Sequence, residues 1–61
     1  MNKLIDAGEG FFLRLLPMWD DEKIHAIDIV IEDEDEGRDM DVILDYKEAI
    51  ELRDYLNELL K

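Results

Sequence analysis

An alternation of apolar and polar residues occurs twice in IHAIDIVIEDEDEGRDMDVILD, residues 24–45. In residues 24–32 and 39–45, apolar side chains recur at every second position and would therefore lie on the same side of an extended chain. This is the two-residue period of a β-strand. The polar run between them contains Gly37, and glycine supplies the conformational freedom that a tight connection often needs. This stretch therefore predicts two antiparallel strands joined by a hairpin turn.

The residues before this hairpin predict a further strand. The segment GFFLRLLP, residues 10–17, is bounded by glycine and proline and is too short for an independent helix. We expect the mostly polar residues 17–23 that follow to form a turn. Nearer the N-terminus, the apolar pair Leu4 and Ile5 precedes turn-like residues 7–10, so this end of the chain allows a short extra strand.

The C-terminal residues 45–61 have the pattern of an amphipathic helix. Asp45 is a suitable N-cap, and Glu48, three residues later, completes the sequence pattern of a capping box. Apolar residues then recur at helical spacing, so the segment predicts an α-helix with one apolar side. The residues on that side are Ala49, Leu52, Leu56, Leu59 and Leu60.

These elements predict a single α+β domain of 61 residues. Its architecture is a three-stranded antiparallel β-meander, with an optional short N-terminal strand, and one C-terminal α-helix packed on one face. We expect the helix to cover one face of the strand over residues 10–17, together with Ile27, Ile29, Ile31, Met40, Val42 and Leu44.

One helix cannot cover both faces of a sheet, so apolar side chains are expected to remain on the other face. Such a patch usually marks an interface, and we expect it to hold a homodimer together or to anchor a partner. Its predicted members are Phe12, Leu16, Trp19, Val30 and Ile43. Trp19 is compatible both with a binding hot spot and with a cap on the core.

Charge restricts the partners that this chain can bind. Eighteen acidic residues against seven basic ones give a net charge of −11. A surface of this sign repels DNA, RNA and anionic lipid and attracts basic proteins. The chain lacks an apolar stretch of the roughly 18 residues that cross a membrane, and its N-terminus lacks the apolar core of a secretory signal. We therefore expect a cytoplasmic protein, in the host cytoplasm if it is phage-encoded.

Few residues are suited to catalysis or to metal binding. The chain contains no serine, threonine or cysteine, so the usual hydroxyl and thiol nucleophiles are missing, and His25 is its one histidine. An EF-hand loop fits poorly, because Gly37 at its sixth position puts Ile43 where a bidentate glutamate belongs. We expect a non-enzymatic protein without a cofactor or a dedicated metal site. Small domains without disulfides often depend on oligomerisation, which again favours a homodimer.

Carboxylates are concentrated in residues 31–41 and recur along the predicted helix. They either serve solubility alone or form a recognition surface for a basic protein. In size and charge the chain resembles phage-encoded DNA mimics, and this resemblance implies that the partner is a nucleic-acid-binding host protein. The residues predicted to contact a basic partner are Glu32, Asp33, Glu34, Asp35, Glu36, Asp39, Glu51, Asp54 and Glu58.

Overall fold

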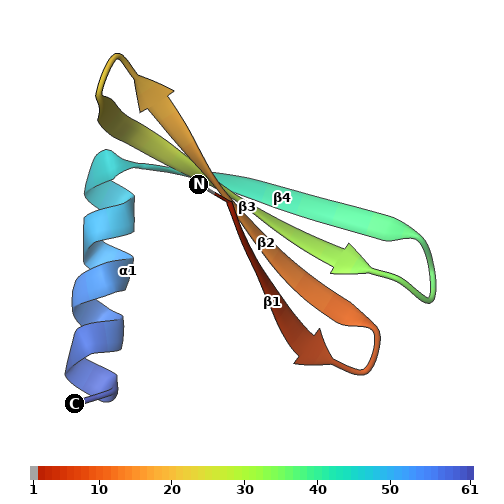
Figure 1. The fold of residues 1–61 in the computed structure, drawn as a ribbon. Helices are drawn as coiled ribbons and strands as arrows, with labels where there is room; N and C mark the ends of the chain where they lie inside the picture. Colours follow the sequence, from red (N-terminus) through yellow and green to blue (C-terminus); the bar gives the residue numbers. More distant parts are fainter. Residues whose placement is uncertain (1) are drawn as a thin grey trace.

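Four strands and one helix make up residues 2–61, the part of the chain described by the computed structural model (Figure 1). The elements are β1 (Lys3–Gly8), β2 (Phe11–Asp20), β3 (Lys23–Asp33), β4 (Arg38–Asp45) and α1 (Tyr46–Leu59). The strands lie in the order β1-β2-β3-β4, and each neighbouring pair is antiparallel. The predicted α+β meander with a C-terminal helix packed against it is confirmed, and the optional N-terminal strand is present as β1.

Local signals in the sequence determine the β3–β4 turn and the start of α1. In the turn, Gly37 has a φ of 65°, and its N–H donates to the Asp33 carbonyl at 2.8 Å. At the helix start, the Asp45 carboxylate accepts the Glu48 N–H at 2.8 Å, and the Glu48 carboxylate accepts the Asp45 N–H at 3.0 Å. The predicted hairpin and the predicted capping box are therefore confirmed.

The prediction of a turn over residues 17–23 is largely wrong, because β2 continues through Pro17 to Asp20. Within the described residues β1 pairs with β2 only as far as Leu15, so Pro17 lies where β3 is the one hydrogen-bonded neighbour of β2. A strand tolerates proline in such an edge position. Beyond it the register shifts and leaves His25 as the extra residue of a bulge in β3, which increases the local twist.

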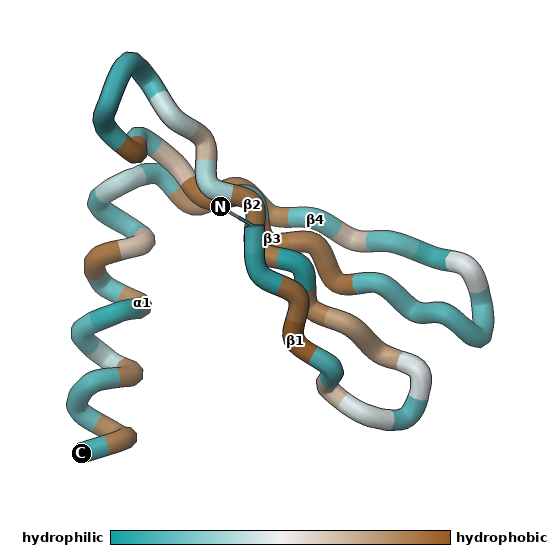
Figure 2. The backbone as a smooth tube through the Cα atoms, viewed as in Figure 1, coloured by the Kyte–Doolittle hydropathy of each residue, from teal (hydrophilic) through white to brown (hydrophobic). Residues whose placement is uncertain are grey.

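The pairing register defines two faces of the sheet. Leu15, Ile29 and Val42 lie side by side on the face toward α1, which we call the helix-side face. Arg14, Val30 and Asp41 form the corresponding row on the opposite face, which we call the open face. Hydrophobic residues follow the strands, whereas the β3–β4 turn is hydrophilic (Figure 2). Among residues 2–61, the helix-side face is the more apolar one, because Arg14, Asp28, Glu32 and Asp41 all lie on the open face.

α1 covers only part of the helix-side face. Ile27, Ile29 and Leu44 are half-buried, as expected for residues beneath the helix. The expectation that α1 also covers Ile31, Met40 and Val42 is wrong, because all three are exposed, Met40 by 72% and Val42 by 52%. No loop separates β4 from α1, so the helix starts at the edge of the sheet and diverges from it (Figure 1).

The chain is more open than a compact chain of its mass. Its accessible surface is 5296 Å², whereas a compact protein of 7.2 kDa exposes about 4,100 Å². Its radius of gyration is 12.9 Å, against about 10.5 Å for a compact chain of this length. Within residues 2–61, Ala26 is the one buried hydrophobic residue, and α1 has no buried residue. Little of the apolar surface is thus removed from water within one protomer.

Candidate functional site

The acidic turn, which we define as residues 32–36 together with Asp39, is tied to the neighbouring β1–β2 turn. The Glu34 N–H donates to the Gly10 carbonyl at 2.8 Å, and the Glu36 N–H donates to the Asp33 carboxylate at 3.3 Å. Gly10 has a φ of 84°, and a Cβ at this position would lie 2.9 Å from the Asp35 Oδ2 atom. The backbone of the acidic turn is therefore positioned by specific hydrogen bonds and by the absence of a side chain at Gly10.

Arg14 pairs with one of the predicted partner-binding carboxylates. Its Nε donates to the Glu32 Oε1 at 2.8 Å, and its second guanidinium nitrogen donates to the Oε2 at 3.4 Å. The hydrogen bond from Arg14 lowers the pKa of Glu32, although partial burial opposes that shift. Glu32 is thus held in a pair across β2 and β3 on the open face.

Three other predicted carboxylates are also in ion pairs within the chain. Arg38 approaches Glu36 at 3.4 Å and Arg53 approaches Asp54 at 2.9 Å, and both pairs are exposed. Beyond the end of the helix, the Lys61 Nζ lies 3.7 Å from the Glu58 Oε1. These exposed pairs contribute little to stability, but they reduce the negative charge available to a partner.

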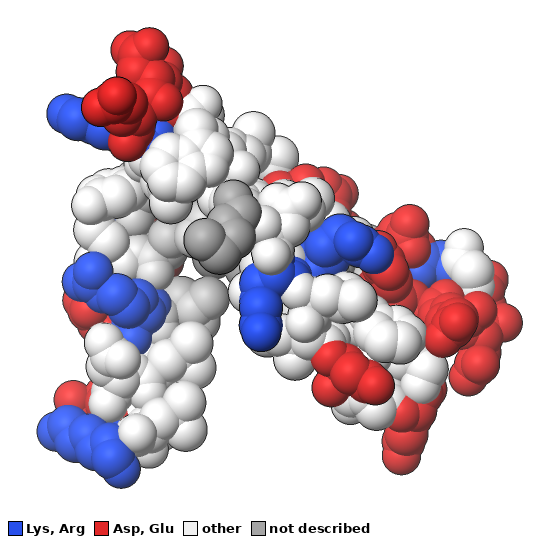
Figure 3. Space-filling view, viewed as in Figure 1, with Lys and Arg blue, Asp and Glu red and all other residues white. Residues whose placement is uncertain are grey.

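Among residues 2–61, the remaining predicted carboxylates outside ion pairs are Asp33, Glu34, Asp35, Asp39 and Glu51. The structure brings the first four together at the end of the sheet, whereas Glu51 lies on α1, apart from them. Figure 3 shows acidic groups gathered at the outer turns of the sheet. The acidic turn is thus a local cluster, and the helix acids are a separate surface.

The open face also carries a close pair of carboxylates. Burial raises the pKa of Asp28, and the neighbouring Asp41 raises it further. The Asp28 Oδ1 atom is buried and accepts no hydrogen bond from the described residues. Ionisation of Asp28 therefore opposes folding.

The predicted apolar patch on the open face is interrupted by these polar groups. Phe12, Leu16 and Val30 are half-buried, and Ile43 is exposed. Trp19 does not belong to the patch, because it lies on the helix-side face and lines a cleft between the sheet and α1. Alternation continued from Leu15 through Pro17 would have placed Trp19 there, and the assumed turn at proline obscured that signal.

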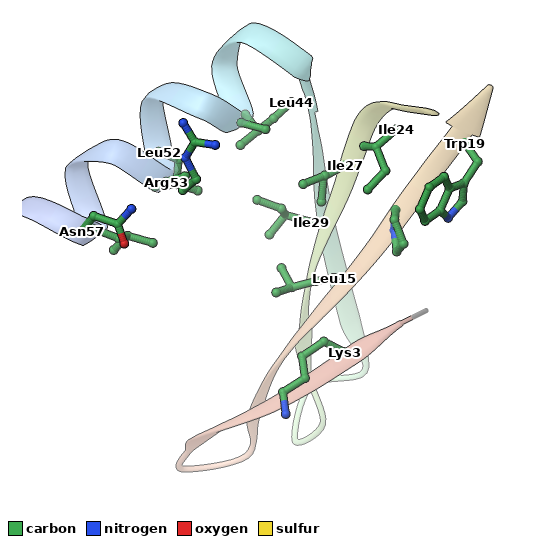
Figure 4. A pocket seen from close by; sticks show the side chains of 13 residues that line it. Lys3, Leu15, Trp19, Ile24, Ile27, Ile29, Leu44, Leu52, Arg53 and Asn57 are labelled. Carbon is green, nitrogen blue, oxygen red and sulfur yellow. The ribbon is translucent and has the colours of Figure 1, made fainter. Parts of the chain in front are cut away.

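A cleft lined mainly by apolar side chains lies between α1 and the sheet. It has a volume of about 500 Å³ and thirteen lining residues (Figure 4). The charged residues on its wall are Lys3 and Arg53, and none of the thirteen is acidic. The lining residues are Lys3, Leu15, Pro17, Trp19, Ile24, Ile27, Ile29, Leu44, Ala49, Leu52, Arg53, Leu56 and Asn57.

No arrangement of side chains in residues 2–61 indicates a metal centre or a membrane span. Groups of three or more histidine, cysteine, aspartate or glutamate side chains placed to hold a metal ion are absent from this part of the chain. His25 is exposed at the β3 bulge. The helix in these residues is too short and too polar to cross a bilayer. The acidic turn and the apolar cleft are therefore the two candidate binding surfaces of the described residues.

No protein-family model, curated protein sequence or solved structure matches this chain.

Proposed function

We propose that this chain is a protein-binding domain without catalytic activity that binds a basic surface of another protein through its acidic turn. The observation that carries the proposal is the cluster of carboxylates outside ion pairs, Glu34, Asp35 and Asp39, on a backbone held by the Gly10 carbonyl. A turn that is already ordered loses less entropy on binding than a flexible one. Its charge would chiefly speed association with a basic partner.

In its most specific form, the proposal names a nucleic-acid-binding protein as the basic partner. Such proteins present lysine and arginine to a row of phosphates, and a compact cluster of carboxylates can compete for the same side chains. The net charge of −11 on 61 residues supports this version. A chain of phage or mobile-element origin would then act as a DNA mimic and inhibit that protein in the host cytoplasm.

A second candidate function is a homodimeric structural or regulatory accessory protein whose acidity serves only solubility. The observation that favours it is the internal pairing of Glu32, Glu36, Asp54 and Glu58. Carboxylates that are paired within the chain have less charge to offer to a partner.

The first test is a capture experiment with the immobilised protein and a bacterial lysate at moderate salt. An enriched nucleic-acid-binding protein that DNA displaces would support the mimic version. If many different basic proteins bind and elute together as the salt concentration rises, the second candidate function, in which acidity serves only solubility, would be supported instead.

The captured protein then allows a matched comparison of two charge-neutralised variants. The first is Glu34→Gln, Asp35→Asn and Asp39→Asn, and the control is Asp20→Asn, Asp21→Asn and Glu22→Gln at the β2–β3 turn. Each removes three charges. At about 0.5 kcal/mol for each exposed pair, the first variant should weaken binding about tenfold and flatten its salt dependence, while the control keeps most of the affinity. Equal losses in both variants would contradict binding through the acidic turn.

A further inference from the structure

The excess surface of the protomer indicates that a second molecule covers part of it. Two separate protomers expose about 10,600 Å², whereas a compact particle of twice the mass exposes about 6,800 Å². Association would thus have to remove about 3,800 Å² in total. Stable permanent complexes bury about 2,000 to 5,000 Å², so a dimer of ordinary compactness accounts for the excess.

The exposed apolar residues place that contact on the helix-side face. Ile31, Met40 and Val42 are exposed on the sheet beyond the reach of α1, and Trp19 is exposed by 53% at the end of the cleft. On α1 and its C-cap the apolar side is uncovered at Leu52, Leu56, Leu59 and Leu60. The open face has fewer exposed apolar residues, and they are separated by Arg14, Glu32 and Asp28.

Charge favours a second copy of the chain over a basic partner in the cleft. The cleft wall carries Lys3 and Arg53 and no acid, so a basic helix would find no carboxylate on it to pair with. The α1 helix of a second copy instead presents leucines to the cleft, while Glu51 and Glu58 lie on the opposite side of that helix and stay in water. Figure 3 shows the acidic groups of the sheet mainly on its outer turns, with further acidic groups along the helix. Two chains of charge −11 can therefore meet here with little repulsion.

We propose that α1 of a second copy packs into the cleft of the first, and that α1 of the first packs in the same way into the cleft of the second. The result is a two-fold symmetric homodimer. A helix of 14 residues is about 21 Å long and presents its leucines at three- and four-residue spacing. The leucines of each α1 would then contact Ile29 and Trp19 of the other copy and cover its exposed Met40 and Val42. A symmetric contact of this kind closes on itself and does not propagate. The contact reaches Met40, which adjoins Asp39 of the acidic turn, but Asp39 lies opposite Glu32 on the open face and so on the other side of the sheet.

A matched pair of leucine variants tests the position of the contact. Leu56 lines the cleft and is 43% exposed in the protomer, and Leu4 is 48% exposed on the open face. Sedimentation velocity at micromolar concentrations should give a dimer for the wild type and for Leu4→Gln. The Leu56→Gln variant should dissociate about 100-fold more readily, because each interface loses two buried leucines. A monomeric wild type, or equal effects of both substitutions, would overturn the proposal.

A measurement on the wild-type protein avoids any dependence on whether Leu56→Gln still folds. Isotope-filtered NOE spectra of a mixture of labelled and unlabelled protein detect only contacts between copies. The expected contacts join the Leu52 and Leu56 methyl groups to Trp19 and Ile29. Intermolecular contacts confined to Leu4 and Ile43 would place the interface on the open face and overturn the proposal. Neither measurement uses a basic partner, so failure of the proposed acidic-turn function would not affect them.

Discussion

Dilution should lower the thermal stability of this protein, because one protomer buries too little surface to fold well alone. An unfolded chain of 7.2 kDa exposes about 10,400 Å², so the folded protomer at 5296 Å² buries about half of it. Domains of this length that fold alone bury about 60%. A compact dimer would bury about two thirds, so folding and association should occur together.

The size of the effect follows from the number of residues that unfold together. A tenfold dilution changes the free energy of a dimer by about 1.4 kcal/mol. The unfolding entropy of two 61-residue chains is about 0.26 kcal/mol/K, so Tm should fall by about 5 °C for each tenfold dilution.

Circular dichroism melts in one buffer provide the measurement, over concentrations from about 2 to about 200 μM. Across this hundredfold range the expected change in Tm is about 10 °C. A control series at higher salt should raise every Tm by relieving self-repulsion while leaving the concentration dependence in place. A Tm that stays constant across the range would show that the protomer folds alone, and the reasoning from its surface area would be refuted.

Three further predictions concern single side chains, each measured as Tm at one fixed protein concentration. Asp28→Asn should raise Tm at pH 7 and leave it nearly unchanged near pH 3. Burial raises the pKa of Asp28, so the stability that its protonated form gives is lost as pH rises through that raised pKa. An equal effect of the substitution at both pH values would contradict this. Asp45→Ala should cost about 1 kcal/mol for each chain, or about 8 °C in Tm, through loss of the helix cap, whereas Asp45→Asn should retain most of that stability. Gly10→Ala should be more destabilising than Gly8→Ala, since both have positive φ but only the first places a Cβ against Asp35; equal losses would show that the Asp35 contact is unimportant.

The parts of the fold that were predictable are those determined by neighbouring residues. The alternation on either side of Gly37 specified the β3–β4 hairpin, and Asp45 with Glu48 specified the helix start. The path of β2 beyond Pro17 was not predictable in this way. It depends on how far β1 pairs with β2, and that is a property of the assembled sheet.

The candidate sites were less predictable, because they depend on register and on the direction of α1. The pairing of Arg14 with Glu32 requires the two residues to meet across β2 and β3, and their sequence separation of 18 gives no sign of it. The exposure of Met40 and Val42 follows from the direct join between β4 and α1. The cleft itself combines residues from all five elements or their connections, from Lys3 to Asn57.

The separation of charged and apolar surfaces connects the two proposals. The acids lie mainly at the outer turns, and the cleft wall has none, so the same chain can associate with itself on one side and repel other acidic molecules on the rest. A two-fold dimer joined through the clefts would display two acidic turns. Two linked binding sites increase affinity for a dimeric basic partner without any new contact, provided that both can be engaged at once. The dimeric protein should then bind a partner that is dimeric more tightly than the same partner in monomeric form, which surface plasmon resonance with the two partner forms would measure.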